Sequence, residues 1–247
     1  VRFVATRRLA LPLTGAPVSE YLQYEGDKFS KSKNIGVFGQ NARSTGVQAS
    51  VWRYYLLQNR PETSDSEFTW DDFVAKNNSE LLNNLGNFVN RMLKFVNAKY
   101  ASVLPDPSAG AATAVDYASP ASARAFAAED ASFVADIDGL LASYVEDMDH
   151  QKIRSALATI MQISARGNQY IQDNRVDNAL LVANPARAAQ VVLATINLIY
   201  VLSALVHPFM PSTSDEILAQ LNATPRSIPD AFELVLLPGH TIGTASH

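Results

Sequence analysis

Residues 188–206 constrain the fold more than any other segment, because nearly every side chain in this run is apolar. A helix that is apolar on all its faces is buried, either at the centre of a helical bundle or in a membrane. Gln190 and Asn197 interrupt the run, and Arg187 and His207 flank it. The run barely reaches the roughly 20 residues that a membrane span requires. We therefore expect the central helix of a bundle and no association with a membrane.

Apolar periodicity predicts further helices, so the expected fold class is all-α, a helical bundle preceded by a short strand and loop. The helices are predicted over residues 69–97, 126–148, 150–173, 188–206 and 214–221. Thr69, with Asp72 three residues on, is expected to cap the first helix. The last helix, over residues 214–221, is expected to be capped near Ser212 or Thr213, after two prolines have stopped the central helix.

Two segments are predicted to lack helix. Residues 101–124 combine prolines and glycine with many alanines, which indicates a surface linker with little intrinsic order. The tail beyond residue 222 carries Phe232 and the apolar run 234–237. We expect this tail to dock on the bundle as an extended segment.

The helix over residues 80–97 has an unusual polar face. Its apolar side chains fall on one side at 3.6 residues per turn; they are Leu81, Leu82, Leu85, Phe88, Val89, Met92, Leu93, Phe95 and Val96. An arc of roughly 120° on the other side carries Asn83, Asn87, Asn90, Arg91, Lys94 and Asn97. Asparagine is a poor helix former, so this face has a purpose beyond solubility. Such amides and an arginine suit unpaired bases, whereas the alternative is a polar seam whose amides are satisfied inside the protein.

A lysine-rich loop, Lys28-Phe29-Ser30-Lys31-Ser32-Lys33, follows the strand-like residues 20–24. Lysine supplies a compact charge on a flexible stem, and serine supplies a hydroxyl donor. Gly26 and Gly36 let the backbone close around an anion. The loop therefore suits a polyphosphate, and the alternative is a solvated basic turn.

In this order, the motifs resemble the C-terminal part of the methionyl-tRNA synthetase family, of the eukaryotic cytosolic type found in fungi. The loop is similar to the KMSKS signature of class I aminoacyl-tRNA synthetases, with Phe29 in place of methionine. The other similar segments are 51–57 (VWRYYLL), 83–91 (NNLGNFVNR), 167–172 (GNQYIQ), 207–211 (HPFMP) and 239–243 (GHTIG). The resemblance runs from about Ser19 to the last residue.

The resemblance implies roles for particular residues. Lys28 and Lys31 would be catalytic, and with Ser30 and Ser32 they would bind ATP and stabilise the charge on its pyrophosphate. The residues implied in binding the CAU anticodon of methionine tRNA are Asn87, Arg91, Asn90 and Lys94. Val176 and Asp177 stand where the family often has a proline and a tryptophan that stacks on the anticodon, and Ser50 replaces an aspartate. The first departure implies either that Asn87 and Arg91 carry more of the recognition or that another group supplies the stacking platform.

The resemblance also implies a division of the chain. Residues 1–45 would end the catalytic region and carry the loop, residues 46–222 would form the anticodon-binding domain, and residues 223–247 the tail. The four histidines lie outside any Gly-rich nucleotide-binding turn, so we expect the chain to be inactive without the catalytic domain of the same enzyme. Residues 1–18 match no family pattern.

Cofactors and partners follow as expectations. The complete enzyme would form methionyl-tRNA from methionine, ATP with Mg²⁺ and tRNA through methionyl-adenylate, as a cytoplasmic monomer, and this part would bind no metal. The chain has no cysteine, which excludes disulfides and thiolate zinc sites. Its net charge of −4 still permits a local basic face that binds tRNA.

Two other classes of protein stay open from the residues alone. One is another class I synthetase, such as a leucyl, isoleucyl or cysteinyl enzyme. The other is a helical interaction module with no affinity for tRNA. We also expect the lysine-rich loop to be disordered without its catalytic domain, since it would have little to pack on.

Overall fold

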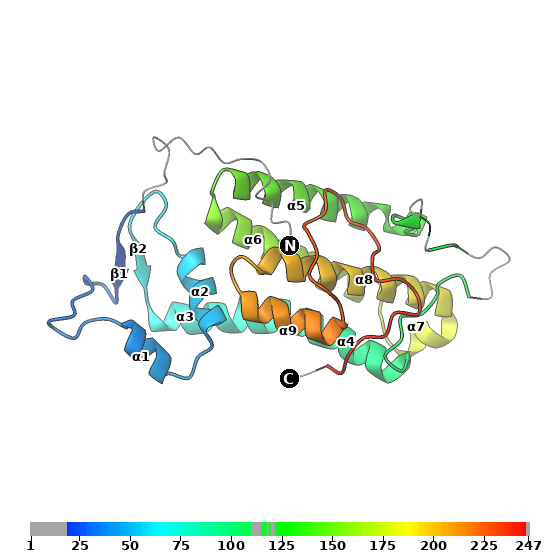
Figure 1. Ribbon diagram of the computed structural model, residues 1–247, viewed down its shortest axis with the longest axis horizontal. Coiled ribbons are helices and arrows are strands. Elements are labelled where there is room, and N and C mark those ends of the chain that lie inside the picture. Colours follow the sequence, from blue (N-terminus) through cyan, green and yellow to red (C-terminus); the bar gives the residue numbers. More distant parts are fainter. Residues whose placement is uncertain (1–18, 110–114, 118, 120–121, 246–247) are drawn as a thin grey trace.

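The computed structural model describes residues 19–109, 115–117, 119 and 122–245 (Figure 1). In chain order the elements are β1 (Leu22–Tyr24), α1 (Gly39–Ser44), α2 (Ala49–Gln58), β2 (Ser66–Phe68), α3 (Trp70–Lys76), η2 (Asn77–Gly86), α4 (Asn87–Lys99), η4 (Ala128–Asp130), α5 (Ala131–Asp149), α6 (Ile153–Asp173), α7 (Asn178–Ala183), α8 (Pro185–Val206) and α9 (Pro211–Leu221). The opening segment 1–18 lies outside the described residues.

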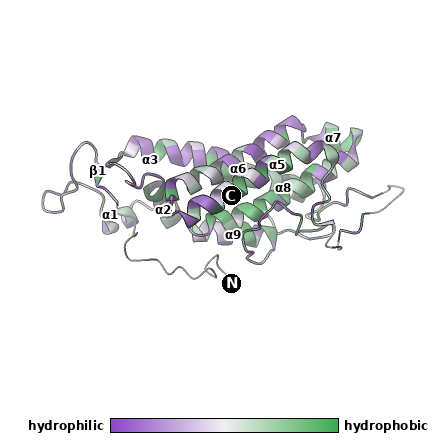
Figure 2. Ribbon diagram, turned by 90° about the horizontal axis from the view of Figure 1, so that it is seen from above, coloured by the Kyte–Doolittle hydropathy of each residue, from purple (hydrophilic) through white to green (hydrophobic). Residues whose placement is uncertain are grey.

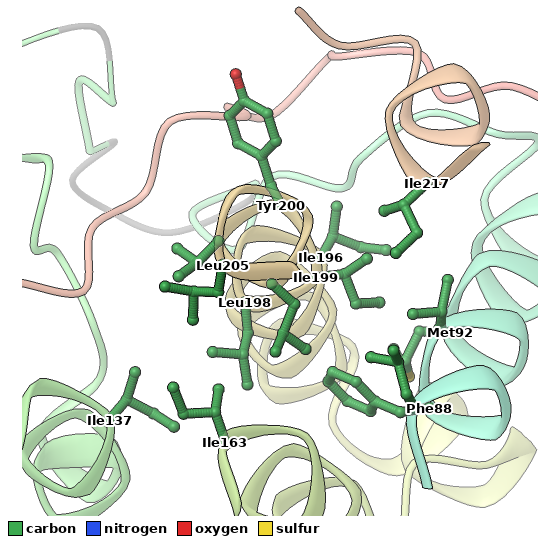
Figure 3. Packing of buried hydrophobic residues seen from close by; sticks show 14 of the residues in the cluster. Phe88, Met92, Ile137, Ile163, Ile196, Leu198, Ile199, Tyr200, Leu205 and Ile217 are labelled. Carbon is green, nitrogen blue, oxygen red and sulfur yellow. The ribbon is translucent and has the colours of Figure 1, made fainter. Parts of the chain in front are cut away.

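Helix α8 forms the centre of the bundle. It is the one helix in the described ranges long and apolar enough to cross a membrane, but 89% of its most apolar window is buried inside the protein. Figure 3 shows side chains of α8 meeting Phe88 and Met92 of α4, Ile137 of α5, Ile163 of α6 and Ile217 of α9. Each such aliphatic or aromatic side chain contributes about 1.5–3 kcal/mol by leaving water. The prediction of a buried central helix is confirmed.

The bundle is built from the long helices that surround α8. Helices α5 and α6 pair as an antiparallel hairpin, and α4 and α9 pack on the other side of α8 (Figure 1). Hydrophobic residues concentrate on α8, while the outer turns of α3 are hydrophilic (Figure 2). The all-α body is therefore as expected, apart from a small two-stranded sheet beside it.

Residues 70–99 form one continuous helical rod made of α3, η2 and α4. The Thr69 hydroxyl oxygen accepts a hydrogen bond from the Asp72 N–H at 3.2 Å, as the sequence predicts. The middle of the rod, η2, is a π-helix, in which hydrogen bonds run over five residues rather than four. The 3.6-residue period fails there, and Leu82 is 62% exposed. The prediction that Leu82 lies on the apolar side is therefore wrong, because the π-helix turns this residue toward solvent.

The sheet joins β1 and β2 in parallel, with Leu22 opposite Ser66 and Tyr24 opposite Phe68. Strand β2 has three residues, too few to give an alternating pattern, and the sequence did not predict it. Beside the sheet, an aromatic cluster centres on Tyr55, Phe68 and Phe73. Trp52 and Trp70 pack against this cluster, with Trp52 stacked on Phe68.

The segment after α4 departs from the prediction of a surface linker. Leu104 is 1% exposed, and its N–H and carbonyl pair with the carbonyl of His240 and the N–H of Gly239 at 2.9 Å. Further on, Arg124 donates to the Phe232 carbonyl at 3.0 Å. Both ends of residues 101–124 are therefore fastened to the tail, because the tail offers unpaired backbone groups beside them.

The tail packs along the bundle in extended form. Phe232, Leu234 and Leu236 are buried. Asn197 of α8 accepts hydrogen bonds from the N–H groups of Val235 and Leu236 at 2.7 and 2.8 Å, and donates to the Leu236 carbonyl at 2.9 Å. One buried amide thus satisfies three backbone groups of the tail.

Helices α9 and α7 both depart from the prediction. Helix α9 begins at Pro211 with Met210 as its N-cap, not at Ser212 or Thr213, because proline suits the first helical turn. Helix α7 was not predicted, and Asp177 caps it by accepting from the N–H groups of Ala179 and Leu180. Six residues are too few for a helical period to be visible.

Candidate functional site

The polar face of α4 is open to solvent at three positions. Asn87, Arg91 and Lys94 are exposed, whereas Phe88 and Met92 between them are buried against α6 and α8. No ion pair of Arg91 or Lys94 is present among the described side chains. The cations and the Asn87 amide are therefore available to a ligand.

Other asparagines of the rod form hydrogen bonds inside the protein. Asn97 donates to the Gly243 carbonyl at 2.9 Å and accepts from the Ala245 N–H at 2.9 Å, so it holds the tail. Asn84 donates to the Met161 carbonyl at 2.9 Å. For Asn97 the polar-seam interpretation is correct, and Asn84, which lies outside the predicted arc, is satisfied in the same way. Asn90 is intermediate, with its Oδ1 enclosed and without a hydrogen-bond partner.

Contacts with α6 fix the rotation of α4. Gly167 lets α6 approach so closely that a Cβ there would lie 2.5 Å from Cζ of Phe88. Asn168 of α6 also donates to the carbonyl of Asn84, which lies one turn before Phe88 on the rod, at 3.1 Å. These contacts hold Phe88 in the core, while Asn87 and Arg91 remain exposed at the edge of the same helix. The segment 167–172 therefore serves the site by positioning α4.

The lysine-rich loop forms a tight hairpin. Ser30 and Ile35 pair through both backbone hydrogen bonds at 2.8 and 2.9 Å, and Asn34 has a positive φ of 55° at the turn. Phe29 packs between Tyr24 and Phe38 at ring-centroid distances of 5.3 and 6.1 Å. The loop thus has an aromatic anchor that the sequence analysis did not consider, and its mobility in solution stays a prediction.

Gly36 is required by this anchor. Its φ of 127° lies where side chains are rarely tolerated, and a Cβ would meet the Phe29 ring at 2.4 Å. The lysines around the anchor, Lys28, Lys31 and Lys33, all remain exposed. Ser30 and Ser32 lie with their hydroxyl oxygens 3.4 Å apart. The hairpin therefore presents cations and hydroxyls on a short, defined turn.

A hollow of about 590 Å³ separates this hairpin from α1. Its lining residues are Lys31, Asn34, Phe38, Gly39, Gln40, Asn41 and Arg43. Of the residues predicted to bind ATP, Lys31 lines the hollow and Lys28, Ser30 and Ser32 do not. The sequence analysis missed Arg43, although it stands in the run 28–61, which contains no aspartate or glutamate.

The positions that lack the stacking aromatic have structural roles. Val176 is buried in the core, and Asp177 caps α7. The adjoining turn is held by Arg187, which pairs with Asp130 through two hydrogen bonds of 2.7 and 2.9 Å and donates to Asn174 at 2.6 Å. Neither residue 176 nor 177 presents a ring, so the missing platform is not replaced at these positions.

Tyr170 joins the same buried network. Its hydroxyl donates to Asp130 at 2.7 Å. Burial, and then the hydrogen bond to the Asp130 carboxylate, raise the pKa of Tyr170 far above its usual range. Its ring stacks on Phe133 at 3.9 Å. The raised pKa keeps the hydroxyl protonated, so it donates to Asp130 and stabilises the turn.

Ser50, the second departure, has a structural partner. It is 3% exposed, and its hydroxyl lies 2.6 Å from the hydroxyl of Ser212 on α9. On the same helix Arg53 donates to the carbonyls of Phe209 and Pro208 at 2.7 and 3.0 Å. These contacts join α2 to the corner between α8 and α9.

Carboxylates are distributed unevenly along the chain. Residues 81–105, which include α4, contain no carboxylate side chain, and neither do residues 28–61. Helix α5 carries five carboxylates and no basic residue. In Figure 1, α1 and α4 lie along the bottom and α5 lies at the top. A molecule with a net charge of −4 therefore still contains two stretches without carboxylates that can face a polyanion.

No cluster of three or more potential metal-ligating side chains was found in the part of the chain that the structure describes. His150 contacts the carbonyl of Glu146 on its own helix at 2.8 Å. Asp147 lies 4.0 Å from Lys152. The candidate ligands at the α5–α6 turn thus have local partners.

Two known protein families match the chain. The description of one matching family is "tRNA synthetases class I (M)", over residues 5–93. The other is "Anticodon binding domain of methionyl tRNA ligase", over residues 120–245, just over half the chain. The chain belongs to the methionyl-tRNA synthetase family. The resemblance inferred from the motifs is confirmed, but the first match begins at residue 5, so the expectation that residues 1–18 match no family pattern is wrong.

Individual members of the methionyl-tRNA synthetase family are closely similar to the chain. It is 50% identical over 229 residues to the probable cytoplasmic methionine–tRNA ligase of Schizosaccharomyces pombe, covering 91% of this chain and 27% of that protein. It is 46% identical to the cytoplasmic enzyme of Saccharomyces cerevisiae, covering 93% and 28%. The chain thus spans little more than a quarter of these relatives' length.

A solved structure of the family shares the fold. The Mycobacterium tuberculosis methionyl-tRNA synthetase in complex with methionyl-adenylate superposes with a TM-score of 0.72 and 26% identity, covering 90% of this chain and 41% of that one. The helical body and the small sheet described above therefore belong to an arrangement that a methionyl-tRNA synthetase uses.

Proposed function

We propose that this chain is the tRNA-binding part of a methionine–tRNA ligase and that α4 recognises the CAU anticodon of methionine tRNA. The observation that carries the proposal is the exposed face of Asn87, Arg91 and Lys94 on a helix whose rotation is fixed by its contacts with α6. An amide can donate to and accept from a base edge, and a guanidinium can stack on a splayed base or hold a phosphate. Lys94 adds a cation that can pair with the phosphate backbone of the tRNA.

Asn90 contributes to this face from a half-buried position. Its Oδ1 has no partner inside the protein, and an enclosed acceptor without a partner is costly. A bound base that draws the amide outward would supply that partner. Asn90 is therefore proposed as the fourth anticodon-binding residue, beside Asn87, Arg91 and Lys94.

The hairpin is proposed as the KMSKS loop, with Lys28 and Lys31 as its catalytic cations and Ser30 and Ser32 as further ATP contacts. The lining of the adjacent hollow fits phosphate, because it includes two cations and no carboxylate. ATP supplies the activated phosphoryl group, and Mg²⁺ would enter with it. The residues of this chain hold and orient the negative charge that develops on the pyrophosphate.

The whole protein is proposed to make methionyl-tRNA from methionine, ATP and tRNA through methionyl-adenylate, as a cytoplasmic monomer. The relatives are named cytoplasmic methionine–tRNA ligases. Methionine activation would need the catalytic domain of the same enzyme. The domain boundaries near residues 45 and 222 are part of this proposal.

A filter-binding assay tests the proposal. The 247-residue chain is titrated with methionine tRNA carrying its CAU anticodon and with the same tRNA carrying a changed anticodon, each at two salt concentrations. We expect tighter binding of the CAU form, and affinity for both that falls as salt rises, since phosphate contacts release counterions. Equal affinity for the two tRNAs would refute anticodon recognition.

A further inference from the structure

The hollow between the hairpin and α1 contains a cation that the proposed ATP contacts leave without a role. Lys31 stands on the hairpin side, and Arg43 stands on α1 with Gln40 and Asn41. Arg43 is exposed and makes no ion pair within the described residues. Two unpaired cations thus line one cavity from separate elements.

The rest of the lining offers hydrogen-bond donors. Asn34 and Gln40 contribute amides that are exposed to solvent. Asn41 uses its Oδ1 to accept from the Phe38 N–H at 3.2 Å, which leaves its amide NH₂ group able to donate. The lining contains no aspartate or glutamate. A cavity with cations, amide donors and no anion selects a negatively charged ligand.

We infer that Arg43 is a phosphate-binding residue that works with Lys31 to hold the phosphate groups of a ligand in this hollow. A guanidinium forms two parallel hydrogen bonds with phosphate oxygens, whereas Lys31 acts as a point charge on a flexible stem. The inference deepens the proposed function, on which it rests for the nature of the ligand, by adding to the hairpin a residue from α1.

The dimensions favour a ligand with more than one phosphate. A volume of about 590 Å³ lies within the usual range of small-molecule sites, and it exceeds what a single carboxylate fills. Lys28 and Lys33 nearby on the hairpin raise the positive potential further. The polyphosphate of ATP and the phosphate backbone of a single-stranded RNA share this chemistry.

Isothermal titration of the 247-residue chain with sodium tripolyphosphate tests the inference. We expect Arg43→Gln to weaken binding by about three- to tenfold, as does Lys31→Gln, because each removes a charge-assisted contact in a hydrated site. Arg43→Lys is expected to restore part of the loss. Lys33→Gln is the matched control, since it removes the same charge from the hairpin without touching the hollow; it should change affinity less than twofold.

Two outcomes would overturn the inference: no binding of tripolyphosphate to the unaltered chain, or an Arg43→Gln chain that binds as tightly as the Lys33→Gln control. Competition by ATP and by a five-nucleotide RNA then shows which ligand supplies the phosphates, and displacement by either supports the site. Anticodon discrimination, measured separately on the same variants, shows whether the proposed function stands when this inference fails.

Discussion

At the scale of single residues, identical side chains have different roles on one helical rod. Asn87 is exposed, Asn97 fastens the tail, and Asn84 bonds to α6. The sequence pattern placed Asn87 and Asn97 on one polar face and left Asn84 outside it, but could not tell which amides were satisfied internally. Their partners, the carbonyls of Gly243 and Met161, lie 146 and 77 residues away in the chain. Only tertiary packing decides which asparagines remain available.

Gly167 is the residue on which the placement of α4 most depends. A methyl group there would lie 2.5 Å from Cζ of Phe88 and 3.0 Å from Cδ2 of Leu198, both in the core. We predict that Gly167→Ala lowers the free energy of unfolding by about 1–3 kcal/mol, because overpacking outweighs the better helix propensity of alanine. Urea denaturation measures this change.

Gly139 on α5 provides the control for that substitution. It is exposed, and an added Cβ would meet nothing within 4 Å. Gly139→Ala should leave stability unchanged or raise it by up to about 1 kcal/mol. If Gly167→Ala were as stable as Gly139→Ala, the close approach of α4 and α6 would be wrong.

At the scale of elements, long periodic helices could be predicted and short ones could not. The central helix was expected over 188–206 and spans Pro185–Val206. Strand β2 has three residues, too few for a visible alternation, and helix α7 has six, fewer than two helical turns. The π-helix η2 could not be predicted, because its apolar pattern looks like that of an ordinary α-helix in which one leucine, Leu82, falls on the wrong side.

Docking of the tail depends on one amide of α8. Asn197 is fully buried and satisfies three backbone groups of residues 235 and 236. We predict that Asn197→Leu lowers the free energy of unfolding by about 2–4 kcal/mol, since buried N–H and C=O groups lose their partners. Urea denaturation gives this value, and protease sensitivity of the tail should rise with it.

Thr195→Val is the matched control on the same helix. The Thr195 hydroxyl is also buried but bonds only to carbonyls of its own helix, at 2.7 and 3.0 Å. We expect a cost below about 1 kcal/mol for this change, since no other element loses a partner. A loss for Asn197→Leu no greater than that of Thr195→Val would disprove the role assigned to the amide.

A carboxylate makes the fastening of the tail dependent on pH. Burial alone would raise the pKa of Asp138, but hydrogen bonds from Arg124 and the Phe232 N–H lower it below its usual value. A lowered folded-state pKa stabilises the fold above the unfolded value, near 4, and this contribution is lost as pH falls through the lower folded value.

Asp138→Asn therefore tests the pH effect. We predict that it lowers the free energy of unfolding by about 1 kcal/mol at pH 7, a modest value because the pair is partly exposed. The difference from the unaltered chain should shrink as pH falls below about 4, where the carboxylate also becomes protonated. A difference that is the same at pH 3 and pH 7 would contradict the assigned ionic contact.

At the scale of the whole molecule, α2 joins the two parts that the proposed function needs. Tyr54 packs into the bundle core and Tyr55 into the aromatic cluster beside the hairpin. The Tyr54 hydroxyl also bonds to Glu80 on η2. The lysine-rich hairpin and the exposed face of α4 are therefore carried on one connected framework, with the acidic helix α5 at the top of the molecule in Figure 1.

The sequence could predict the family and the exposure of Asn87, Arg91 and Lys94 on α4, because motif order and helical period are local properties. It could not predict Arg43 opposite Lys31, since the hollow between them forms only when α1 folds beside the hairpin. Nor could it show that Leu104 and the tail are paired, because their hydrogen bonds join residues more than 130 positions apart. Long-range pairing is what the structure adds.

Anticodon discrimination by α4 variants tests the central claim most directly. The quantity is the ratio of affinities for methionine tRNA with its CAU anticodon and with a changed one, for the unaltered chain, Asn87→Ala and Arg91→Ala. Lys28→Ala and Lys31→Ala serve as controls and should leave the ratio nearly unchanged. We predict that each α4 variant loses about 1–3 kcal/mol of discrimination while keeping its fold; an undiminished ratio in both α4 variants would contradict the account.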